Sequence, residues 1–150
     1  MIVDVQVSIQ GSKSAVWAAM TDIENASDFI SGIQKIEVLD KPAHGLVGLK
    51  WRETRMLFGK PASADKWITH AAENEYYKTR AESDGFIFLS TLSISEGNGG
   101  ITLVSCHDSQ PQTLATRLMS IPMGLFFKGV AKKALRQDLN DIKTAVERQK

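Results

Sequence analysis

The sequence contains a single cysteine, Cys106, among its 150 residues. One thiol excludes an internal disulfide and the zinc sites that several cysteines build, and it fits a reducing, cytoplasmic setting. No stretch approaches the ~18 to 20 apolar residues of a membrane-spanning helix. The N-terminus enters an alternating pattern at once, without the basic segment and apolar core of a signal peptide. We therefore expect a cytoplasmic protein without stable membrane insertion.

Neither sign of charge is in excess, because 18 Lys and Arg residues face 17 Asp and Glu residues, for a net charge of +1. A dedicated nucleic-acid surface is therefore not expected. The Gly-x-Ser-x-Gly motif of serine hydrolases does not occur. The glycine-rich run 97–100 lies between two strand patterns, which predicts a hairpin turn and not a phosphate-binding loop. The histidines show no ligand spacing, so a metal site is not predicted.

A series of strand patterns, followed by one long helix pattern, makes up most of the sequence. Val3, Val5, Val7 and Ile9 alternate with polar residues, which is typical of a strand with one buried face. Two short helix patterns follow, and the second ends at Gly32. Short turn signals then imply an antiparallel meander. Its strands are predicted over residues 36–39, 47–57, 62–71, 76–82, 86–95 and 101–109.

The last part of the chain, 111–150, predicts one long amphipathic helix with Pro111 in its first turn. Its apolar residues form two stripes that are one residue, or about 100° of rotation, out of phase. Such a turning stripe suits a strongly twisted surface. The first stripe is Met123, Phe127, Val130 and Ala134, and the second is Leu135, Leu139, Ile142 and Val146. Helices gathered on one antiparallel sheet indicate a single α+β domain over 1–150.

Three stretches of sequence carry a resemblance to a known superfamily. Residues 14–25, which begin Ser-Ala-Val-Trp and end Thr-Asp-Ile-Glu-Asn, are similar to its opening helix and Asp-rich turn. Residues 47–55 are similar to its glycine-containing third strand, and residues 135–147 to its terminal helix. Together they resemble the START-like or Bet v 1-like (SRPBCC) superfamily, and within it the polyketide cyclase/dehydrase group.

The resemblance implies a helix-grip fold. A highly curved seven-stranded antiparallel sheet would wrap round the long C-terminal helix, with two short helices between the first two strands. The enclosed cavity would hold an apolar or amphipathic ligand without a cofactor, in a monomer or a dimer. Relatives include lipid and sterol carriers, plant hormone receptors, aromatase/cyclases, ubiquinone-binding proteins and chaperone activators. The fold therefore leaves the function open.

Candidate polar site residues lie on two of the predicted strands. Glu53 and Arg55 share one face of strand 47–57 with Trp51. If that face is buried, the two charges must pair with each other, with another side chain or with the polar end of a ligand. If the strand twists, they lie at the solvent rim instead. His107 is a candidate general base, because the ordinary pKa of histidine is near neutral pH. The candidate catalytic residues are thus Glu53, Arg55 and His107.

Candidate apolar walls come from the sheet and from the final helix. Methionine adapts to irregular shapes, so the Met-rich and Gly-rich part of the helix suits a pocket roof, although it equally suits ordinary core packing. The full predicted ligand-binding set is Trp51, Glu53, Arg55, Phe88, Ser90, Met119, Met123, Phe127 and Val130.

Three functions remain open from the sequence. The leading hypothesis is the binding of a hydrophobic or amphipathic small molecule, such as a lipid, a polyketide or an isoprenoid-like compound. The second is a cofactor-independent enzyme of the cyclase or dehydratase type that uses polar residues in the same cavity. The third is a protein-interaction module in which the pocket is vestigial.

Overall fold

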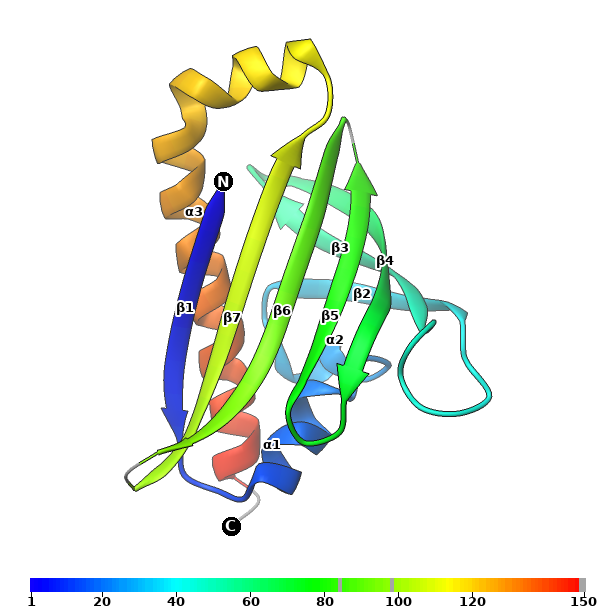
Figure 1. Cartoon of the computed structure of the whole chain (residues 1–150), viewed down its shortest axis with the longest axis vertical. Coiled ribbons are helices and arrows are strands. Elements are labelled where there is room, and N and C mark those ends of the chain that lie inside the picture. Colours follow the sequence, from blue (N-terminus) through cyan, green and yellow to red (C-terminus); the bar gives the residue numbers. More distant parts are fainter. Residues whose placement is uncertain (84, 98, 149–150) are drawn as a thin grey trace.

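The computed structural model describes residues 1–83, 85–97 and 99–148, and the side chains of 119–127 lie outside that description. Seven strands and three helices follow one another along the described chain (Figure 1). They are β1 (Ile2–Ile9), α1 (Lys13–Met20), α2 (Ala26–Phe29), β2 (Ile33–Asp40), β3 (Lys50–Leu57), β4 (Lys60–Ala72), β5 (Tyr76–Ser83), β6 (Phe86–Gly97), β7 (Gly100–Pro111) and α3 (Leu114–Glu147).

All strand pairs are antiparallel, in the order β1-β7-β6-β5-β4-β3-β2. Strands β2 to β7 therefore form the meander that the short turns predicted, and β1 joins its β7 edge. Register shifts in β2 and β4 bend the sheet. Figure 1 shows α3 changing direction, so that its first turns lie across one end of the sheet and its later turns run beside β1 towards α1. The predicted α+β helix-grip architecture is confirmed.

The start of the last helix differs from the prediction. Pro111 is the final residue of β7, and α3 begins three residues later. Thr113 caps the helix, because its Oγ1 accepts a hydrogen bond from the backbone N–H of Thr116 at 3.1 Å. The Thr116 Oγ1 in turn accepts from the backbone N–H of Thr113 at 3.1 Å. This reciprocal cap, and not the proline, fixes the helix start.

The hydrophobic core lies between the inner face of the sheet and the helices. From α3, Leu139, Ile142 and Val146 are buried in it, and Leu135 packs against it, so the second predicted stripe covers the core. Of the first stripe, Ala134 and Val130 are exposed, and the side chains of Met123 and Phe127 lie outside the description. Within the described residues, no helix is both long and apolar enough to cross a membrane.

Candidate functional site

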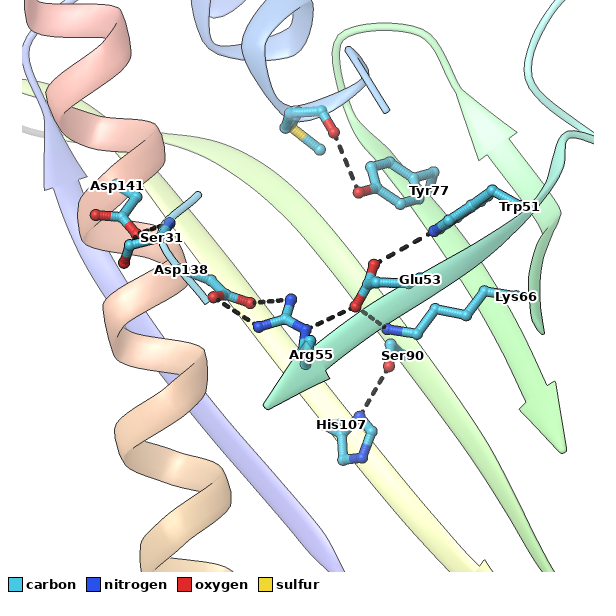
Figure 2. A network of polar contacts seen from close by, with 11 residues as sticks. Ser31, Trp51, Glu53, Arg55, Lys66, Tyr77, Ser90, His107, Asp138 and Asp141 are labelled. Atoms are coloured by element: carbon cyan, nitrogen blue, oxygen red, sulfur yellow. Dashed lines mark hydrogen bonds and ion pairs between the residues drawn. The ribbon is translucent and has the colours of Figure 1, made fainter. Parts of the chain in front are cut away.

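Strand β3 turns Trp51, Glu53 and Arg55 towards the inside of the sheet. Glu53 is only 7% exposed and receives three hydrogen bonds (Figure 2). Trp51 Nε1 donates to Glu53 Oε1 at 3.3 Å, and Arg55 Nε donates to Oε2 at 2.7 Å. Lys66 Nζ, from the neighbouring strand β4, donates to the same Oε2 at 2.9 Å. Of the two sequence alternatives for Glu53 and Arg55, the structure therefore shows the buried face and not the rim.

Arg55 also ties the sheet to α3. Its Nη1 and Nη2 donate to the two carboxylate oxygens of Asp138 at 3.1 and 2.8 Å, which is a bidentate pair (Figure 2). The guanidinium lies against the backbone of Gly32, where an added Cβ would stand 2.8 Å from Nη1. A nearby second link joins the same helix to the loop before β2, since Asp141 accepts hydrogen bonds from the backbone and hydroxyl of Ser31. Arg55 is thus held in place by the protein itself.

The network keeps Glu53 and Arg55 ionised. Burial alone would raise the pKa of Glu53, but the charges and hydrogen bonds of Lys66 and Arg55 outweigh it and lower the pKa to about 2. Burial works against the positive charge of Arg55, yet Glu53 and Asp138 raise its pKa above the ordinary value. Burial raises the pKa of Asp138, while the Arg55 guanidinium opposes that rise. Neither Glu53 nor Arg55 can therefore exchange a proton readily near neutral pH.

A second polar group lies further along the inner face, on β6 and β7. The Ser90 hydroxyl and His107 Nδ1 are 2.9 Å apart, and the His107 ring stacks on Phe88 with ring centroids 5.7 Å apart (Figure 2 shows the serine and the histidine). Burial lowers the pKa of His107 to about 4, and the positive charge of Lys66 acts in the same direction. His107 is therefore neutral at neutral pH and can accept a proton.

A pocket opens between the inner face of the sheet, α1, α2 and α3. Its cavity volume is about 120 Å³, and it is open to solvent on one side. Apolar walls come from the helices and the core, and polar groups from the sheet. Residues lining it include Met20, Ile23, Phe29, Ile30, Ile36, Trp51, Glu53, Arg55, Lys66, Tyr77, Thr79, Ser90, Leu92, Ser105, Leu135, Asp138 and Leu139.

The structure brings together only part of the predicted site. Four of the predicted residues line the pocket, namely Trp51, Glu53, Arg55 and Ser90. Phe88 and His107 stand beside Ser90 but do not belong to the lining. Val130 is 39% exposed and lies outside the lining. The predicted helix residues Met119, Met123 and Phe127 have side chains outside the description. Within the described part of the chain, no group of three potential metal ligands gathers.

Sequence reasoning missed Lys66, Asp138 and Tyr77. The Lys66 side chain is 31% exposed and contacts Glu53. The signal was present, because Lys66 and the buried Ile68 share one face of the same strand. Asp138 lies one residue before the buried Leu139, on the edge of the apolar stripe. Tyr77 is buried and its hydroxyl donates to the carbonyl of Met20 at 3.1 Å, which holds the end of α1 against the sheet.

The chain is similar to one known protein family and to several solved structures. The family described as "Polyketide cyclase / dehydrase and lipid transport" matches residues 1–147. No curated protein sequence matches the chain. Among solved structures, a protein from Thermus thermophilus, TTHA0849, has a TM-score of 0.83 at 12% identity, with 99% of each chain covered.

Two further structures extend the comparison. A START superfamily protein from Mycobacterium smegmatis has a TM-score of 0.81 at 18% identity, with 99% of each chain covered. The Zhui aromatase/cyclase from Streptomyces sp. R1128 has a TM-score of 0.82 at 15% identity, covering 99% of this chain and 94% of that one. At such identities, the structural matches show a shared fold and leave the chemistry open.

Proposed function

The chain belongs to the polyketide cyclase/dehydrase and lipid transport family, whose members typically bind hydrophobic ligands, and we propose that it binds one amphipathic small molecule in the pocket between the sheet and α3. The ligand would be a lipid, a polyketide or an isoprenoid-like compound with a single carboxylate or carbonyl end. The cytoplasmic location predicted from the sequence is part of this proposal.

The pocket lining supports an apolar body for the ligand. Ile23 from the segment between α1 and α2, Phe29 from α2 and Leu135 from α3 line the pocket. Trp51 of the sheet forms an aromatic wall of the same pocket. Burial of apolar area against such walls contributes roughly 25 cal/mol per Å². An open pocket of this kind gives ligand binding more support than a vestigial pocket on a protein-interaction module.

The spare hydrogen-bond donors of Lys66 are the observation that supports a polar end on the ligand. Arg55 donates three hydrogen bonds to Glu53 and Asp138, whereas Lys66 donates only one of its three N–H groups, to Glu53. Lys66 lines the pocket, and so does the hydroxyl-bearing Ser90. We therefore assign to Lys66 the ligand contact that the sequence suggested for Arg55.

Replacement of Lys66 by methionine tests this assignment. We expect Lys66→Met to weaken the binding of a medium-chain carboxylate such as decanoate about 10-fold or more, because a hydrogen bond to a charged group contributes roughly 1.5 to 3 kcal/mol. The affinity for the uncharged methyl ester should fall by less than about 3-fold in the same variant. Calorimetric titration of both ligands measures the difference.

Lys78→Met is the matched control, because Lys78 is exposed on the adjacent strand β5, with its amine 5.9 Å from the centroid of the Tyr76 ring. It should change neither affinity. Equal losses for the acid and the ester in Lys66→Met would remove Lys66 from the site, and a wild-type protein that binds neither would contradict the proposed ligand class.

A second candidate function, a cofactor-independent enzyme of the cyclase or dehydratase type, is favoured by the hydrogen bond between Ser90 and His107. His107 is then the proton acceptor and is reached from the pocket through the Ser90 hydroxyl, since Ser90 lines the pocket and Glu53 stays ionised and paired. With a poly-β-ketone model substrate, we expect His107→Gln to lower kcat by about 100-fold while the binding constant stays within about 3-fold. Product analysis by mass spectrometry checks turnover. An unchanged kcat in this variant would exclude His107 as the proton acceptor, and no turnover by the wild type would contradict the enzymatic function.

A further inference from the structure

The acidic residues of α3 contact the rest of the protein, and its basic residues lie on the outward side of the helix. The helix carries three acidic residues, Asp138, Asp141 and Glu147, and each is engaged with the body of the protein. Asp138 holds Arg55, Asp141 accepts from Ser31, and Glu147 accepts from the backbone N–H of Gln10. The outward side is consequently left with the cationic residues of the helix.

Three of these cations surround a hollow on the outer side of α3. The hollow measures about 260 Å³ and is lined by Gly129, Lys132, Lys133, Arg136, Gln137 and Asn140, which follow one another at helical spacing. Lys132, Lys133 and Arg136 are exposed, and none of them forms an ion pair with any residue that the structure describes. Gly129 leaves open space, with nothing within 4 Å of an added Cβ. The hollow thus combines three cations that have no ion pair among the described residues with the amide of Asn140 and that of Gln137, which also donates to Asp141 Oδ1 at 3.0 Å.

From this arrangement we propose that the hollow binds the phosphate headgroup of an anionic lipid, so that α3 docks on a negatively charged membrane surface. Charge complementarity supplies the attraction, at about 1 kcal/mol for each Lys or Arg near such a surface. The proposal rests on the proposed function, since an amphipathic ligand would be collected from or delivered to a bilayer. The opposite side of the same helix lines the ligand pocket with Leu135, Asp138 and Leu139.

Exposed apolar side chains on the same helix favour a lipid surface over an acidic protein. Val130 is exposed next to Gly129, beside the hollow. Leu114 and Leu118 are 74% and 61% exposed on the first turns of α3, which lie across one end of the sheet before the helix changes direction. A helix with exposed apolar residues and a cationic side is typical of interfacial binding, where the apolar groups enter the headgroup layer. Asp138 and Glu147 are engaged with the body of the protein, and Asp141 is held by Ser31 on one carboxylate oxygen and by Gln137 of the hollow on the other, at 3.0 Å.

Vesicle flotation tests the proposal with the full chain. We expect the protein to float with phosphatidylcholine vesicles that contain phosphatidylglycerol, and not with phosphatidylcholine alone. Binding should weaken steeply as salt rises. The triple variant Lys132→Glu, Lys133→Glu, Arg136→Glu should bind at least about 100-fold more weakly. Soluble glycerol phosphate at millimolar concentration should not displace the protein, because docking uses the whole charged surface.

A charge-matched control is Lys35→Glu, Lys41→Glu, Lys78→Glu, whose three lysines are exposed on other parts of the chain. It changes the net charge equally and should keep wild-type flotation. Equal loss in both triple variants would overturn the proposal, and so would wild-type binding to soluble polyglutamate without binding to anionic vesicles. Displacement by glycerol phosphate would instead identify a site for free phosphate compounds and would also overturn it.

Two variants distinguish a failure of the membrane contact from a failure of the ligand pocket. Lys66→Met should float like the wild type, and the α3 triple variant should bind decanoate in solution like the wild type. Loss of flotation with intact decanoate binding refutes the membrane contact alone. Loss of decanoate binding with intact flotation refutes the pocket assignment alone.

Discussion

Replacement of Arg55 by alanine is expected to lower the free energy of unfolding by about 3 to 5 kcal/mol, the cost of removing one partner from a buried ion pair. The variant would leave Asp138 without its bidentate partner and Glu53 with only Trp51 and Lys66. Two carboxylates would then share the inner face with the single charge of Lys66. Urea unfolding followed by circular dichroism measures the loss.

Arg52 provides the matched control on the same strand. It makes a similar two-bond pair, with Asp65 at 2.8 and 3.3 Å, but on the exposed outer face of the sheet. Solvent screens such a pair, so Arg52→Ala should change the stability far less than Arg55→Ala. Similar losses for the two variants would show that the Arg55 network does not hold α3 to the sheet.

Acid is expected to destabilise the protein as His107 becomes protonated. The pKa of His107 is about 4 in the folded protein and near 6.5 when unfolded. The stabilisation of the folded state by neutral His107 is therefore complete above about pH 6.5 and is lost as the pH falls towards 4. Each pH unit within that window costs roughly 1.4 kcal/mol, or on the order of 3 kcal/mol in all. Unfolding by urea at pH 7.5 and at pH 4.5 measures the difference.

His107→Gln removes the titrating group but keeps a hydrogen-bond partner for Ser90, so its stability should vary much less between these two pH values. His70→Gln changes the same residue type at an exposed position of β4, and the acid loss should persist in it. An equally steep loss in His107→Gln would show that other groups cause the acid sensitivity.

At lower pH the carboxylates act in opposite directions. The lowered pKa of Glu53 means that its contribution is present above about pH 4.5 and is lost as the pH falls towards 2. The raised pKa of Asp138 means the reverse, because protonation of that carboxyl is easier in the folded state. Protonation of Asp138 therefore offsets part of the stability that the protein loses when Glu53 is protonated.

The fold could be predicted from the sequence because alternation and turn residues act locally. The side-chain period of two placed Trp51, Glu53 and Arg55 on one face of a strand, although it left open whether that face was buried. Pro111 was assigned to the helix because a proline suits a first turn, whereas the reciprocal cap of Thr113 and Thr116 starts it later. Local signals thus located the elements better than their ends.

The candidate site depends on contacts that no local pattern reveals. Arg55 meets Asp138 across 83 residues of chain, and this pairing follows from the curvature of the sheet and the course of α3. Lysine is seldom buried, so nothing local marks Lys66 as a site residue, and it is the charge of Glu53 that keeps it at the pocket. The roles of Arg55 and Lys66 therefore became distinct only when their partners were known.

Native mass spectrometry of the protein purified from its own host tests the central claim most directly. The account predicts a stoichiometric complex with one small amphipathic molecule, released on denaturation, that carries a single carboxylate or carbonyl group on an apolar body. The complex should be depleted in Lys66→Met and retained in Lys78→Met. A protein that is empty from its host, and that gains no mass and no thermal stability with fatty acids, isoprenoids or polyketides, would contradict the account.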